Sequence, residues 1–93
     1  MKSCKARDIE AALLKKGFRI KESHHKIFYL VRNGKITGVH TFLSHGIRDY
    51  NADLLAKMRG QLHLSGKELD DLLRCPLSGE EYLHMLEKRG VFQ

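Results

Sequence analysis

The sequence has no tryptophan, only one proline and only two cysteines, Cys4 and Cys75. Two isolated cysteines exclude a dense disulfide scaffold and a paired-thiol redox motif. No apolar run approaches the roughly 18 residues that cross a bilayer. The first residues are charged and do not form the apolar segment of a signal peptide. We therefore expect a cytoplasmic protein with no membrane partner, in which Cys4 is a terminal residue and Cys75 packs beside a helix end.

Motifs that bind cofactors or metals are also missing. A chain of 93 residues is too short for a dinucleotide-binding fold or a barrel enzyme. It contains no glycine-rich phosphate loop, no HxH or HExxH motif and no paired cysteines. We expect one domain with no cofactor and no metal.

The basic residues are unevenly distributed along the chain. The whole chain has 17 Lys and Arg against 11 Asp and Glu, a net charge of +6. Residues 1–50 carry a balance of +7, whereas residues 51–93 carry a balance of −1. A positive first half favours a polyanionic partner. A solvated, lysine-rich surface is the alternative interpretation.

The first half of the chain predicts one helix and three strands. Apolar residues recur at helical spacing over residues 5–16, and the glycine that follows is a typical helix end. Residues 27–31 are rich in β-branched and aromatic side chains, and an Asn-Gly pair separates them from a similar run at residues 36–42. This pattern is typical of a β-hairpin. Residues 18–21 are expected to add a third strand.

The alternation along the central predicted strand assigns its two faces. We take Ile27, Tyr29 and Val31 as the core face, which would direct His24 outward together with Lys26.

The second half predicts short helices. Asn51 is a good N-cap, and Ser65 and Ser78 each begin a capping box with a glutamate three residues later. The expected order is αβββα followed by two short C-terminal helices. The predicted fold class is therefore α+β, with one three-stranded antiparallel sheet.

Several short motifs in this order resemble the HicA (YcfA-like) family of mRNA interferase toxins. The motifs are Lys16-Gly17-Phe18, then Ser23-His24-His25-Lys26-Ile27-Phe28, then a hairpin, then Phe42-Leu43-Ser44-His45 before a helix. The resemblance covers roughly residues 5–73 and implies a small αβββα unit like a double-stranded-RNA-binding domain. We expect residues 1–75 to form this unit and residues 76–93 to form a helical extension packed on it.

The resemblance implies the toxin of a type II toxin–antitoxin pair, held inactive by a HicB-like antitoxin. Such a toxin is a metal-independent endoribonuclease that cleaves mRNA with a single catalytic histidine. This histidine maps onto His24, which would act as base on the ribose 2′-OH or as acid on the leaving 5′-oxygen. His25 and His45 are candidate supporting residues, and Ser23 maps onto the small residue that precedes the catalytic histidine.

Basic residues near this motif are the candidate contacts to RNA phosphates. Together with Ser23, the expected RNA-binding residues are Lys15, Lys16, Lys21, Lys26 and Arg32. Glu22 stands where the family has glycine, and its carboxylate would repel phosphate. This departure leaves two alternatives open: a catalytically inactive RNA-binding module, or a protein-interaction domain that uses its C-terminal helices. RNA preference and oligomeric state are open.

Overall fold

A computed structural model describes residues 3–74 and 76–92 of the chain, so the expectation for Cys75 lies outside the described residues. In chain order the elements are β1 (Cys4–Lys5), α1 (Ala6–Lys15), β2 (Phe18–Glu22), β3 (Lys26–Arg32), β4 (Lys35–Leu43), β5 (Asp49–Tyr50), α2 (Ala52–Gln61), α3 (Gly66–Arg74) and α4 (Gly79–Lys88). Strands β2, β3 and β4 form one antiparallel sheet in that order. The predicted α+β class and its three-stranded sheet are confirmed.

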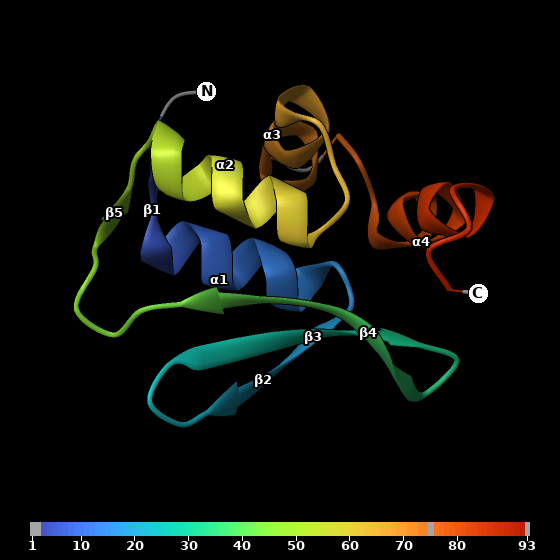
Figure 1. Cartoon of the computed structure of the whole chain (residues 1–93), viewed down its shortest axis with the longest axis horizontal. Coiled ribbons are helices and arrows are strands. Elements are labelled where there is room, and N and C mark those ends of the chain that lie inside the picture. Colours follow the sequence, from blue (N-terminus) through green and yellow to red (C-terminus); the bar gives the residue numbers. More distant parts are fainter. Residues whose placement is uncertain (1–2, 75, 93) are drawn as a thin grey trace.

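The helices lie on one side of this sheet and leave its other face open (Figure 1). Phe28 and Leu30 of β3 are fully buried with the core residues of α1, whereas Tyr29 is only half-buried. The prediction that Ile27, Tyr29 and Val31 form the core face is therefore wrong. Both faces of β3 are apolar, so alternation alone could not decide which face α1 covers.

The β3–β4 hairpin forms as its two turn residues predict. Asn33 and Gly34 have φ angles of 53° and 77°, the positive values that a type I′ turn needs at both central positions. A register shift interrupts the ladder between Tyr29 and Val31. There the Thr37 hydroxyl donates to the Leu30 carbonyl at 2.8 Å, which satisfies a backbone acceptor beside the irregularity.

A second, two-stranded sheet joins the start of α1 to the segment after β4. Strands β1 and β5 pair antiparallel, with Cys4 opposite Tyr50. The Ala6 amide donates to the Arg48 carbonyl at 2.7 Å. This pairing could not be predicted, since strands of two residues are too short to show an alternating pattern.

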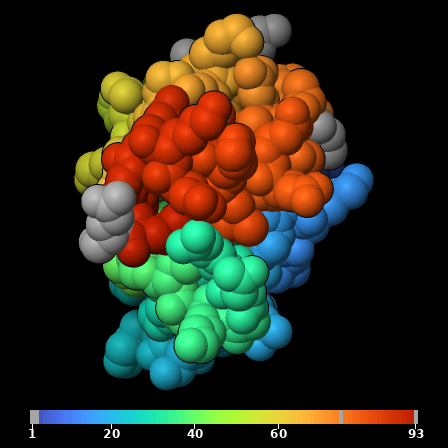
Figure 2. Space-filling model, turned by 90° about the vertical axis from the view of Figure 1, so that its right-hand side faces the viewer, coloured from blue at the N-terminus to red at the C-terminus, as the bar shows by residue number. Residues whose placement is uncertain are grey.

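Helix α4 packs into the same hydrophobic core as the sheet. Tyr82 and Leu86 are fully buried, and the Tyr82 ring stacks on Phe18 at a centroid distance of 6.1 Å. The Tyr82 hydroxyl donates to the Leu62 carbonyl at 2.8 Å. Figure 2 shows α4, in red, covering this end of the molecule directly above the β3–β4 hairpin. Residues 76–92 are thus part of one core with the strands.

The start of α4 is fixed against the end of α1. The Lys16 side chain is buried and its ammonium donates to the Leu77 carbonyl. The two backbones come so close that a Cβ at Gly79 would lie 2.5 Å from the Lys16 carbonyl oxygen. Glycine is therefore required at the first residue of α4 for steric reasons.

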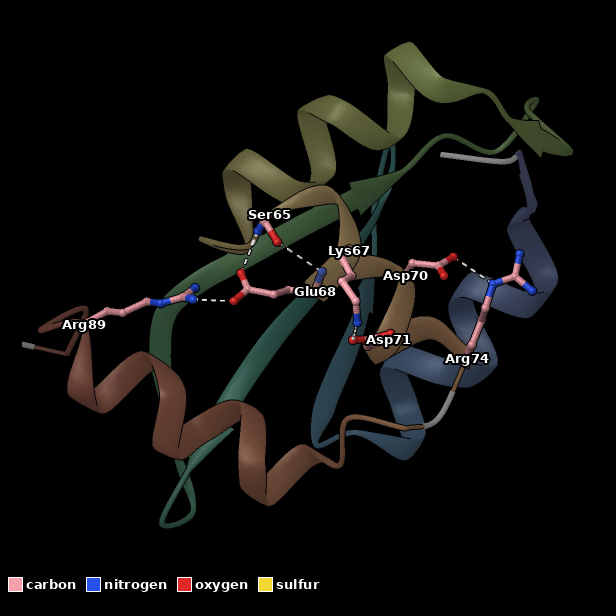
Figure 3. Close-up of polar contacts among 7 residues, drawn as sticks. All are labelled: Ser65, Lys67, Glu68, Asp70, Asp71, Arg74 and Arg89. Carbon is pink, nitrogen blue, oxygen red and sulfur yellow. Dashed lines mark hydrogen bonds and ion pairs between the residues drawn. The ribbon is translucent and has the colours of Figure 1, made fainter.

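Helices α3 and α4 are joined by a polar cluster (Figure 3). Glu68 completes the Ser65 capping box, accepting from the Ser65 amide at 2.8 Å, and also binds the Arg89 guanidinium. Arg89 donates to the His63 carbonyl at 2.7 Å as well. Hydrogen bonds from Arg89 and from the Ser65 amide lower the pKa of Glu68 from 4.5 to about 2. Both predicted capping boxes, at Ser65 and Ser78, are confirmed.

We predict opposite effects for alanine at two helical glycines. Gly79→Ala should lower the free energy of unfolding by about 2 kcal/mol, because its methyl group would overlap backbone atoms. Gly60→Ala, with nothing within 4 Å of the added Cβ, should raise it by about 0.5–1 kcal/mol. Urea denaturation of both variants measures the difference, and equal effects would contradict the close contact at Gly79.

We also predict that acid weakens the fold through Glu68. A carboxyl whose folded pKa is lowered stabilises the protein above about pH 4.5, and this contribution is lost as the pH falls towards 2. The ion pair is partly solvated, so the loss should be about 1 kcal/mol rather than the full linkage value. Urea denaturation above and within this pH window should show a smaller loss for Glu68→Gln. An equal loss in the variant would refute the assignment.

Candidate functional site

The β2–β3 turn presents the Ser23-His24-His25 segment to solvent. These three residues follow the last residue of β2 and precede the first of β3, and all three are exposed. The Ser23 amide donates to the His25 carbonyl at 3.0 Å, which closes the turn and leaves His24 at its tip. The fold therefore places His24 where a large ligand can reach its imidazole.

The segment after β4 brings His45 to the same turn. The His45 Nε2 atom lies 3.3 Å from the Ser23 carbonyl oxygen, although the two residues are 22 positions apart. The Ser44 amide donates to the Tyr50 hydroxyl at 2.7 Å, and Tyr50 itself is buried. This contact holds the segment that carries His45. The turn and this segment lie at one end of the sheet, opposite α4 (Figure 1).

A pocket of about 550 Å³ lies next to the turn. Its lining includes Lys26, the residue that follows the turn, and His45, which contacts the turn through Ser23. It lies between the start of α1, the first residue of β3 and the segment after β4. Its charged lining residues are Lys5, Arg7, Glu10, Lys26, Arg48 and Asp49. Four cationic side chains against two carboxylates give the pocket a positive balance, which suits an anionic ligand.

Lys26 is engaged by carboxylates on both sides. Its ammonium lies 2.8 Å from Glu10 and 3.9 Å from Glu22. The hydrogen bond to Glu10 is the main cause that raises the pKa of Lys26. Lys26 therefore offsets the charge of Glu22, so the carboxylate at the edge of the turn faces a cation. The same pairing reduces what Lys26 can offer to a phosphate.

The structure corrects the prediction that Lys16 contacts RNA. Lys16 is only 5% exposed, its ammonium binds the Leu77 carbonyl, and its backbone lies against Gly79 at the start of α4. The sequence could not reveal this burial, since Leu77 is 61 residues away.

The other predicted phosphate contacts are scattered. Arg32 lies at the hairpin end of β3, where it pairs with Glu87 at 3.1 Å and lies over the Phe92 ring. Lys15 ends α1, which leads into the far end of β2, about 17 Å of extended strand from the turn. Lys21 is exposed near the turn, opposite Ile27 in the ladder. Of the predicted RNA-binding residues, the fold thus brings Lys21, Ser23 and Lys26 near His24.

Three cationic residues near the turn were not among the predicted RNA-binding residues. Lys5, Arg7 and Arg48 are exposed and line the pocket. Their positions depend on the β1–β5 pairing, which places the start of α1 beside the segment after β4. The charge balance of residues 1–50 was the only sequence signal that included them.

Comparisons with models of known protein families, with curated proteins and with solved structures found no match. Within residues 3–74 and 76–92, no three His, Cys, Asp or Glu side chains are grouped so that they could hold a metal ion. In the same ranges, no helix has the length and apolar character needed to cross a membrane. Function is therefore inferred from the side chains around the turn.

We predict that Tyr50→Phe loosens the segment that carries His45. The variant removes the hydroxyl that accepts from the Ser44 amide, so this amide should exchange with solvent about tenfold faster. Amides of the central strand, such as Phe28, should keep their protection. Hydrogen exchange followed by NMR measures both, and unchanged exchange at Ser44 would contradict the role of Tyr50.

Proposed function

We propose that the chain is a HicA-like endoribonuclease, the toxin of a type II toxin–antitoxin pair, with His24 as its catalytic residue. One observation carries the proposal: His24 is exposed on a closed turn, beside His45 and a positively charged pocket. The order of α1, the three strands and α2 supports a fold like that of a double-stranded-RNA-binding domain. A phosphodiester within this end of the molecule would meet both imidazoles and cations.

The proposed reaction needs only proton transfer and charge stabilisation. A base removes the proton of the ribose 2′-OH, and the 2′-oxygen forms a bond to the adjacent phosphorus. The bond from phosphorus to the 5′-oxygen breaks, and an acid protonates this leaving oxygen. The products are a 2′,3′-cyclic phosphate and a 5′-hydroxyl.

His24 acts as the base or the acid in this reaction, because an imidazole can perform either role near neutral pH. His45 faces the same turn from the segment after β4 and can orient it through the Ser23 carbonyl. Lys21 and the cations of the pocket stabilise the extra negative charge on the phosphorane. A single acid–base group contributes about 10²–10⁴-fold, which is consistent with a slow enzyme.

We predict that His24→Ala lowers the rate of RNA cleavage at least about 100-fold without unfolding the protein. Cleavage of a labelled mRNA by purified protein, analysed on a sequencing gel, measures the rate. His84→Ala is the matched control, because His84 is an exposed histidine on α4 at the other end of the molecule. Expression of the unaltered chain should arrest growth, and expression of the His24→Ala variant should not. If a folded His24→Ala protein cleaved RNA at the rate of the unaltered chain, the catalytic role of His24 would be refuted.

A catalytically inactive RNA-binding module is the second candidate function. The observation that favours it is Glu22 on the edge of the turn, with Lys26 already bound to Glu10. An RNA-binding module should bind RNA with an affinity that falls steeply with salt. Such binding, together with no cleavage of any RNA by the unaltered chain, would favour this module over the enzyme.

The third candidate, a protein-interaction domain, has less support. Leu69, Leu72 and Leu86 of the C-terminal helices are fully buried in the chain's own core, so these side chains are not free to dock a partner. A HicB-like antitoxin remains the partner that the proposed function requires.

A further inference from the structure

The open face of the sheet carries a continuous row of rings that begins at the turn. The His25 and Phe42 rings lie edge to face, with centroids 6.4 Å apart. Phe42 is followed by His40 at 5.3 Å, and His40 by Tyr29 at 6.3 Å. We call these four residues the ring row. It runs from the residue next to His24 across β4 to the central strand β3.

The ring row is accessible rather than part of the core. His25 and His40 are exposed, Phe42 is 38% exposed and Tyr29 is half-buried. In the ladder Tyr29 lies opposite His40, and Phe42 lies opposite Ile27, which alternates onto the face away from the helices. The rings therefore form a surface of π-faces and edges on the side of the sheet that the helices leave open (Figure 1).

The charges that border this surface are positive. Arg19 lies opposite Tyr29 in the ladder and Lys21 lies opposite Ile27, so both belong to the same face, and both are exposed. The described strand residues that alternate onto this face include no aspartate or glutamate. Exposed rings beside a cationic edge are the combination that binds single-stranded nucleic acid, since bases stack and phosphates pair with cations.

We propose that the ring row is a stacking platform for the bases of single-stranded RNA, with Arg19 and Lys21 contacting the phosphates. The inference rests on the proposed function, because it takes RNA as the ligand whose scissile phosphate meets His24. Bases in a duplex are already stacked on each other and cannot lie on protein rings. The platform therefore selects a single-stranded segment, and it continues directly from the turn.

The platform also holds the RNA strand in position, which the exposed turn alone does not do. His24 is at an exposed turn, where a flexible RNA strand would not be held in one position. Bases that stack on the ring row fix the neighbouring nucleotides, so the phosphate between them is presented to the imidazole in a restricted geometry. Such positioning accounts for a large part of the rate of many enzymes.

The experiment measures binding in a His24→Ala background, in which RNA is not cut by the proposed reaction. Fluorescence anisotropy follows a labelled oligouridine of about 12 nucleotides and a blunt RNA duplex of the same length. Phe42→Leu keeps an apolar side chain but removes the π-face, and it should weaken oligouridine binding about tenfold or more. Phe42→Tyr should restore binding. Ile36→Ala is the matched control, because Ile36 is 65% exposed on the same face but has no ring, and it should bind as before.

Three results would overturn the platform. These are unchanged oligouridine binding by Phe42→Leu, duplex binding as tight as single-strand binding, and a dimer by light scattering that Phe42→Leu dissociates. The cleavage assay with His24 present tests the proposed function separately. Ring-dependent binding without any cleavage would support the platform and reject the enzyme, whereas cleavage with ring-independent binding would reject only the platform.

Discussion

Packing of α1 against one face of β3 is the constraint on which the rest of the structure depends. Phe28 and Leu30 are fully buried together with Ile9 and Leu13 of the helix. Because alternate side chains of a strand point to opposite faces, this choice exposes Tyr29 and its neighbours on β4. The same choice places the cations of β2 beside the rings. The core thus determines which chemistry faces the solvent.

Local chemistry explains what could be predicted from the sequence. Asn33 and Gly34 tolerate positive φ, and Ser65 and Ser78 cap their own helices, so these elements depend on residues at most a few positions apart. His24 was proposed in the same way, from a short motif between two predicted strands. The faces of β3 could not be predicted, because both are apolar and only packing with α1 decides between them.

The site was harder to predict than the fold because its residues come from distant parts of the chain. His45 reaches the turn only after β4 and the following segment are in place. Arg48 and the residues at the start of α1 meet through two short strands without a sequence signature. The prediction that Lys16 contacts RNA was wrong for the same reason, since the groups that bury this side chain lie in α4 and the segment before it.

The stacking of Tyr82 on Phe18 has a consequence for the order of folding during synthesis. Phe18 begins the first strand of the sheet, yet its ring is covered by Tyr82 of α4. A chain emerging from the ribosome can form α1 and the hairpin early, but it leaves Phe18 exposed until residues 79–88 have emerged. Completion of this core therefore requires the synthesis of α4.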